Sequence, residues 1–208
     1  APGLLFATGE ILPADESATA IVGTRDPSME KAELAENLAQ RLAESGLTVV
    51  SGLAIGVDTS AHAGALKAPN GRTLAVLGSG LRTIHPRQNI AMAMEIAGRG
   101  ALISEFLPGT PPSGPNLMAR DRVISGLSKS VIVIEAGLNS GSMDTAKRAI
   151  KQGRRVFALP GSPGTDHLIA GGALALDPER IDPKALLEAP ADPGQKPGPG
   201  KQLSLWEV

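Results

Sequence analysis

Short runs of apolar residues alternate with longer amphipathic segments along most of the chain. Leu34, Leu38 and Leu42 recur at helical spacing, and they predict a helix over 27–45 that Gly46 ends. The runs rich in valine, isoleucine and leucine predict buried strands at 19–22, 47–50, 73–77, 101–105, 131–135 and 156–159. Two further runs, 4–6 and 10–12, are candidate edge strands. This alternation predicts an α/β fold with a mostly parallel sheet and helices on both faces.

The composition favours one domain followed by a tail. A chain of 208 residues with 42% hydrophobic content can bury one core, which we place at 1–188. Residues 189–208 contain a stretch rich in proline and glycine, which predicts a linker and a C-terminal tail. No apolar run approaches the ~18 residues of a membrane span, no signal peptide is visible, and the chain has no cysteine. We therefore expect a cytoplasmic protein with no membrane partner.

Small and hydroxyl residues follow the carboxyl ends of four predicted strands. The turns are Gly23-Thr24-Arg25, Ser51-Gly52, Gly78-Ser79-Gly80 and Ser140-Gly141-Ser142. After the first turn, Asp26 and Pro27 have the residue types of a helix N-cap and a first helical position. Carboxyl ends of parallel strands share one edge of a sheet, and helix N-termini there offer unpaired N–H groups and a positive dipole end. The four turns together predict a phosphate-binding edge.

The charge distribution also indicates an anionic partner. The net charge is −1, yet residues 72–155 carry 12 Lys and Arg against 5 Asp and Glu. We expect Arg120, Arg122, Lys147 and Lys151 to be cations that flank the phosphate site. The chain has three Phe, one Trp and no Tyr, too few for an aromatic stacking platform. Phosphate contacts with little reading of the bases are therefore expected.

Candidates for catalysis are few. No phosphate-loop motif of the nucleotidases is present, and the Gly78-Ser79-Gly80 turn lacks the third glycine of a dinucleotide fingerprint. Asp58 and His62 share a helix face, but no third metal ligand has suitable spacing, so we favour a helix-start role for Asp58 and packing for His62. Glu135 is the best catalytic candidate, although it could equally bind N–H groups of a neighbouring loop. We predict no metal and assign no catalytic residue.

Many motifs occur in an order typical of one known family. They include Val22-Gly23-Thr24-Arg25, Val50-Ser51-Gly52-Leu53-Ala54, Gly56-Val57-Asp58, Ala61-His62, Ala75-Val76-Leu77-Gly78, His85-Pro86, Ser104-Glu105, Glu135-Ala136, Ser140-Gly141-Ser142 and Pro160-Gly161. Over residues 4–176 the chain resembles the DprA (Smf) family of DNA-processing proteins. The resemblance implies an extended Rossmann-like domain that binds single-stranded DNA, protects incoming strands in natural transformation and helps to load the recombinase RecA. It also implies a homodimer with no cofactor and no catalytic turnover.

The family usually has Phe-Pro where this chain has Leu117-Met118, and three further departures concern polar or charged residues. Asp121 stands where the family usually has asparagine, His85 where it has tyrosine, and Asp144 where it has an apolar residue. Each change could weaken or redirect phosphate contacts. Two alternatives stay open: a nucleotide-processing enzyme of the phosphoribohydrolase type, with Glu135 catalytic, and a passive scaffold for RecA.

The segment 167–176 contains no Lys, Arg, Asp or Glu. It could close the core as a final helix, but apolar residues on more than one side of a short late segment favour partial exposure in a monomer. We therefore expect a homodimer whose interface includes residues around Leu168 to Leu176.

Overall fold

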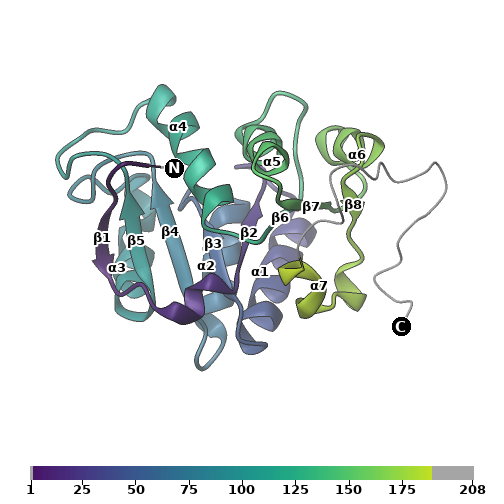
Figure 1. The fold of residues 1–208 in the computed structure, drawn as a ribbon, viewed down its shortest axis with the longest axis horizontal. Coiled ribbons are helices and arrows are strands. Elements are labelled where there is room, and N and C mark those ends of the chain that lie inside the picture. Colours follow the sequence, from purple (N-terminus) through teal and green to yellow (C-terminus); the bar gives the residue numbers. More distant parts are fainter. Residues whose placement is uncertain (1, 189–208) are drawn as a thin grey trace.

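The computed structural model describes residues 2–188, and these form one sheet covered by helices on both faces (Figure 1). The eight-stranded sheet has the order β1-β5-β4-β3-β2-β6-β7-β8. Only β1 runs antiparallel to its neighbour, and the remaining pairs are parallel. The predicted α/β architecture is therefore confirmed. The strands are β1 (Phe6–Gly9), β2 (Ala18–Val22), β3 (Thr48–Ser51), β4 (Thr73–Leu77), β5 (Ala101–Ser104), β6 (Ser130–Val133), β7 (Arg155–Ala158) and β8 (Leu174–Ala175).

The helices form two layers because successive strand residues face opposite sides of the sheet. Along β2, Ala20 and Val22 pack with the α4, α5 and α6 layer, while Ile21 packs with α1 and α2. The second layer also contains α3 and α7. The helices are α1 (Met29–Glu44), α2 (Val57–Lys67), α3 (Ile90–Arg99), α4 (Gly114–Gly126), α5 (Gly141–Lys151), α6 (Pro163–Ala170) and α7 (Pro183–Leu187), with short 3-10 helices η1 (Pro13–Glu16), η2 (Arg87–Asn89) and η3 (Pro178–Arg180).

The first helix begins later than the sequence predicts. Ser28 is its N-cap, and the Oγ atom of Ser28 accepts a hydrogen bond from the Lys31 amide at 3.2 Å. The Asp26 amide instead donates to the Thr24 hydroxyl at 3.3 Å. The prediction of Asp26 as N-cap was therefore wrong, because Asp26 belongs to the turn and the Asp26–Ser28 segment carries the chain from the sheet edge to the helix.

The expectations for the two ends of the domain need correction. Only one edge strand forms near the N-terminus, at β1, and residues 10–12 lead into η1 instead. The segment 167–176 is not one helix. It comprises the end of α6, a turn and the edge strand β8, and it buries Leu168 and Leu176 in the core. The predicted tail, 189–208, lies outside the described residues.

The strand order changes direction at β2. From β2 the chain proceeds outward through β3 and β4 to β5, and it then returns to add β6 on the opposite side of β2. The connections that follow β2 and β6 therefore leave on opposite faces of the sheet and open a crevice at their carboxyl ends. This reversal is the place where open α/β sheets bind ligands.

At the amino ends of the strands, opposite the crevice, the buried carboxylate of Asp15 in η1 connects several segments. It accepts hydrogen bonds from the Leu12 amide at 2.8 Å, the Thr48 hydroxyl at 2.7 Å and Nε and Nη2 of Arg72, both at 2.9 Å. Burial opposes ionisation of this carboxyl, but the hydrogen bonds from Arg72, Leu12 and Thr48 outweigh it and lower the pKa of Asp15. Asp15 thus ties η1 to β3 and to the start of β4.

Replacing Asp15 by alanine is expected to lower the free energy of unfolding at pH 7 by about 2–4 kcal/mol, because the partly buried Arg72 guanidinium, the buried Thr48 hydroxyl and the Leu12 amide lose their acceptor. Since the folded pKa is lowered, the stabilisation is present above the unfolded pKa and is lost as the pH falls through the folded value. Urea unfolding at pH 7 and pH 3 measures both effects. The exposed Glu16→Ala is the matched control from the same turn, and equal losses in the two variants would contradict the assignment.

Candidate functional site

A cavity of about 510 Å³ lies at the crevice where the strand order reverses. We call it the central cavity. Its walls come from the turn after β2, the start of α2, the first half of α4 and the first turn of α5. The lining residues are Val22, Gly23, Thr24, Arg25, Ala54, Asp58, Gly114, Leu117, Met118, Arg120, Asp121, Ile124, Ser140, Gly141, Ser142 and Thr145.

Backbone packing fixes the turn after β2. A Cβ atom on Gly23 would lie 2.6 Å from Cγ2 of Val57, so only glycine fits between β2 and α2. Gly56 has φ +84°, and its Cα approaches the turn so closely that a Cβ would lie 2.7 Å from the Arg25 carbonyl. The Thr24 carbonyl accepts from the Val57 amide at 3.1 Å. The side chain of Arg25 is exposed and makes no ion pair within residues 2–188.

The first turn of α5 forms the opposite wall. Ser140 is the N-cap, and its side chain makes no capping bond but lies 2.9 Å from the Ser142 hydroxyl. The amides that open an α-helix have no acceptor within the helix, and the helix dipole places partial positive charge there. Ser140, Gly141 and Ser142 line the cavity, so the first N–H groups of α5 and two hydroxyls lie at its wall, which is a suitable environment for an anion.

Arg120 forms the floor of the cavity. It is 6% exposed, and its Nη1 atom donates to the carbonyls of Gly52 and Val76, the latter at 2.7 Å. Its Nε donates to Oδ1 of Asp121 at 2.9 Å. One guanidinium thus joins α4 to the carboxyl ends of β3 and β4.

A second buried carboxylate shapes the turn after β3. Oδ2 of Asp58 accepts from the Gly52 amide at 3.1 Å and from the Ala54 amide at 3.3 Å. Burial raises the pKa of Asp58, and the nearby Arg120 opposes that rise. Leu53, between the two donors, has φ +60°, a backbone conformation unusual for leucine. Asn89 holds it there by donating to the Leu53 carbonyl at 2.9 Å.

His62 lies fully buried on α2, with Nδ1 2.7 Å from the Thr73 hydroxyl. Burial, with a smaller contribution from Arg120, lowers the pKa of His62 to about 3, so the ring is neutral at physiological pH. Asp58 and His62 thus occupy the helix-start and packing positions that the sequence favoured. Within the described range, no three side chains are arranged to hold a metal ion.

Two of the four turns predicted to bind phosphate line the cavity. Gly23, Thr24, Arg25, Ser140, Gly141 and Ser142 lie together there, as does Arg120. Ser51 and Gly52 do not line it. The Ser51 hydroxyl donates to the Ile21 carbonyl at 2.7 Å, and Gly52 lies beneath Arg120.

The third turn, Gly78-Ser79-Gly80, is also closed off. The Ser79 hydroxyl donates to the Thr83 carbonyl at 2.6 Å, and the Gly80 amide donates to the Thr110 carbonyl at 2.9 Å. Gly78 packs against Leu117 of α4. All four turns follow the carboxyl ends of their strands, as predicted, but α4 and the loop before it fold over the ends of β3 and β4, so only two of the turns line the cavity.

The flanking cations also differ from expectation. Arg120 is buried and its hydrogen bonds are used within the fold, so it is not a surface cation. Arg122 is half-buried and forms an ion pair with Glu105. Lys147 and Lys151 are exposed on α5, outside the cavity lining.

Sequence reasoning did not identify the apolar wall that α4 contributes. Leu117, Met118 and Ile124 line the cavity from this helix. The Pro/Gly-rich loop before α4 was a signal that the helix could turn back over the sheet edge. Glu135, the catalytic candidate, is not among the lining residues, and its carbonyl accepts from the Thr24 amide at 2.8 Å. None of the helices within 2–188 has the length and apolar character needed to cross a membrane.

Comparison with known sequences reveals close relatives. The family model of DNA recombination-mediator protein A matches residues 1–182. Protein Smf of Escherichia coli is 46% identical over 188 residues, which cover 86% of this chain and 50% of that protein. DNA processing protein DprA of Streptococcus pneumoniae is 42% identical over 179 residues, covering 83% of this chain and 63% of that protein. This chain thus spans about half to two thirds of these two curated relatives.

Solved structures agree with the sequence matches. DNA processing protein A of Streptococcus pneumoniae superposes with a TM-score of 0.77 at 41% identity, covering 84% of this chain and 63% of that one. DNA processing protein A of Helicobacter pylori, described with a single-stranded DNA binding mode, gives 0.78 at 31% identity, covering 89% and 86%. These neighbours confirm the extended Rossmann-like fold. A molybdenum cofactor binding protein of Rippkaea orientalis, with a TM-score of 0.59 at 20% identity, shares the fold alone.

Arg120→Met is expected to lower the free energy of unfolding by about 3–5 kcal/mol, because Asp121 and Asp58 would lose their buried counter-charge. The half-buried ion pair of Arg148 with Asp144 provides a matched arginine control. Arg148→Met should cost less than about 1 kcal/mol. Urea unfolding followed by circular dichroism measures both, and a similar loss in the two variants would refute the structural role of Arg120.

Proposed function

This chain belongs to the DNA recombination-mediator protein A family, and from that premise we propose that it binds single-stranded DNA at the central cavity. The observation that carries the proposal is the convergence of Arg25 with the first turn of α5 where the strand order reverses. Helix-terminal N–H groups, hydroxyls and the exposed guanidinium of Arg25 suit a phosphate of the backbone. The related Helicobacter pylori protein, described as binding single-stranded DNA, supports the choice of ligand.

The exposed charges favour one path for the bound DNA strand. Lys147 and Lys151 extend positive charge along α5 from the cavity, and no ion pair involves either of them within residues 2–188. On the other layer, α1 carries Glu30, Glu33 and Glu36, which would repel a strand. A DNA strand that enters at Arg25 and leaves along α5 therefore avoids the carboxylates of α1.

The wider role follows from the family and not from the geometry. We propose that this chain protects incoming single strands during natural transformation in the cytoplasm and helps to load RecA onto them. The names of its relatives, DNA processing protein and DNA recombination-mediator protein, are in keeping with such a role. We propose that residues 1–188 form the DNA-binding domain and that residues 189–208 are a linker and tail.

Binding without catalytic turnover is the mode we infer, with no resident cofactor. In the enzyme alternative Glu135 would be catalytic, but it is not among the residues that line the cavity. The carboxylates that do line it, Asp58 and Asp121, are bound to amides of the β3 turn and to Arg120. A nucleophile beside a general base is not present among the lining residues.

Arg25→Ala is expected to weaken binding of single-stranded DNA by the same factor whatever the base sequence, and to reduce the slope of log affinity against log salt by roughly one unit, since one phosphate contact is lost. Fluorescence anisotropy across a salt series measures both quantities. Glu33→Gln on α1 is the control and should change neither. An unchanged affinity and slope in folded Arg25→Ala would remove Arg25 from the site.

A homodimer in solution is the assembly we propose, with contacts around Leu168 to Leu176. The edge strand β8 supports this location, because it pairs with β7 on one side alone within the described sheet. Leu168 and Leu176 are buried within the protomer, so the exposed residues Ala170 and Ala175 are the better candidates for direct contact. Two cavities on one assembly would raise avidity for a strand long enough to reach both.

Ala175→Glu is expected to shift the protein from dimer to monomer in light scattering, because the carboxylate would lie unpaired in the interface. Leu174→Glu tests the same strand but also disturbs packing, since Leu174 is half-buried against the core. Ala32→Glu on α1, also half-buried, is a control for the introduced charge. A wild type that stays monomeric at high concentration, or a dimer undisturbed by folded Ala175→Glu, would exclude this interface.

A further inference from the structure

One carboxylate in the central cavity opposes the ligand that the rest of the cavity favours. Asp121 lines the cavity and is 6% exposed. Its Oδ1 accepts from Nε of Arg120, whereas its Oδ2 has no hydrogen-bond partner within residues 2–188. Oδ2 lies 3.8 Å from the point that a Cβ on Gly141 would occupy. The free carboxylate oxygen therefore faces the first turn of α5, where we place a phosphate.

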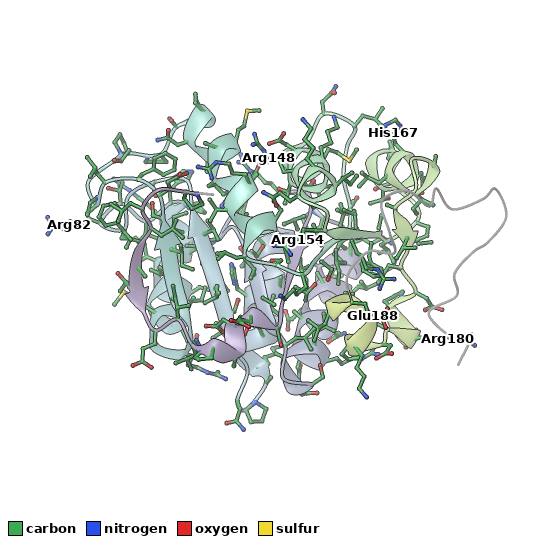
Figure 2. The ribbon with its side chains drawn as sticks, viewed as in Figure 1. Arg82, Arg148, Arg154, His167, Arg180 and Glu188 are labelled. Atoms are coloured by element: carbon green, nitrogen blue, oxygen red, sulfur yellow. The ribbon has the colours of Figure 1, made fainter. Side chains whose placement is uncertain are left out.

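Charged groups reach Asp121 from every element around it. Arg120 is its neighbour on α4, Asp58 comes from α2, Asp144 comes from α5, and Arg25 stands at the turn after β2. Asp144 is itself paired with Arg148, whose Nε lies 2.6 Å from Oδ2 of Asp144. In Figure 2 Arg148 of α5 lies on the side of this helix that is toward α4.

The formal charges of the lining residues show how protonation of Asp121 changes the net charge of the cavity. With both carboxyls ionised, Arg25 and Arg120 are balanced by Asp58 and Asp121. A proton on Asp121 leaves the lining with one net positive charge. The buried ring of His62 stays neutral and does not change this sum above pH 5, because its pKa is about 3.

Burial raises the pKa of Asp121 to about 6, despite opposition from the charge and hydrogen bond of Arg120, and Asp58 and Asp144 add smaller rises. The carboxyl is therefore mostly neutral below pH 6 and mostly ionised above it. An anion that binds beside it favours the neutral form and raises its pKa further.

We propose that Asp121 is a proton-controlled determinant of affinity, whose ionised carboxylate repels the phosphates of a bound strand and whose protonation removes that repulsion. The inference rests on the proposed function, because it requires a polyanion at the central cavity. The affinity for single-stranded DNA should then fall as the pH rises through the titration of Asp121. The variant Asp121→Asn would mimic the protonated state, since the amide oxygen of the introduced side chain can still accept from Nε of Arg120.

The test is fluorescence anisotropy of a labelled oligo(dT) strand between pH 5.5 and 8 at constant ionic strength. Thymine and the phosphodiester do not titrate in this range, so a change reports on the protein. For wild type we expect the affinity to fall about threefold to tenfold from pH 5.5 to pH 8, the size of an interaction below one pKa unit. Asp121→Asn should bind at pH 8 as tightly as wild type binds at pH 5.5, with a flat profile.

Glu95→Gln on α3 is the matched control, because it removes one exposed carboxylate that is not part of the cavity lining. It should keep the wild-type profile. A pH dependence that persists in folded Asp121→Asn would assign the effect to another group, such as Asp58, whose pKa burial also raises. That result would overturn the proposal, as would a flat wild-type profile. No binding by wild type at any pH would instead refute the proposed function itself.

Discussion

The guanidinium of Arg120 is the interaction on which the centre of this structure depends. Parallel strands end in carbonyls and turns that need partners, and α4 crosses over the ends of β3 and β4 to supply one. Nη1 of Arg120 serves the carbonyls of Gly52 and Val76, and Nε holds Asp121. The same charge lies close enough to oppose the raised pKa of Asp58. A buried cation is tolerated here because two carboxylates and two carbonyls surround it.

A series of contacts links the floor of the cavity to the turn that bears Arg25. Asp58 holds the amides of Gly52 and Ala54, and the same turn places Gly56 against the backbone of Arg25. The turn after β2 is also held by the Thr24 amide, which donates a hydrogen bond to the Glu135 carbonyl just after β6. The turn after β2 is therefore held by main-chain contacts with the segments that follow β3 and β6. Such rigidity reduces the entropy lost when a flexible ligand binds.

The sequence predicts the strands, the helix layers and the turns at Gly23–Arg25 and Ser140–Ser142, because each depends on local spacing of apolar, glycine and hydroxyl residues. It does not predict which turns stay open. Ser51 and the 78–80 turn have the same residue types as the open turns, and only the return of α4 over the sheet closes them. The burial of Arg120 is not predictable for the same reason, since an arginine on a helix is usually solvated and nothing in the local sequence marks this one as buried.

The use of Arg120 inside the fold also determines how the cavity can attract an anion. Its charge is shared with Asp121 and with carbonyls, so little of it remains for a ligand. Attraction must come from Arg25 and from the start of α5, whose contributions are each modest at a solvated site. In such a balance a single carboxylate has a large relative effect, and Asp121 can tune affinity without altering the hydrogen bonds that hold the floor. The fold and the strength of the site are thereby separable, although adjacent residues of one helix govern them.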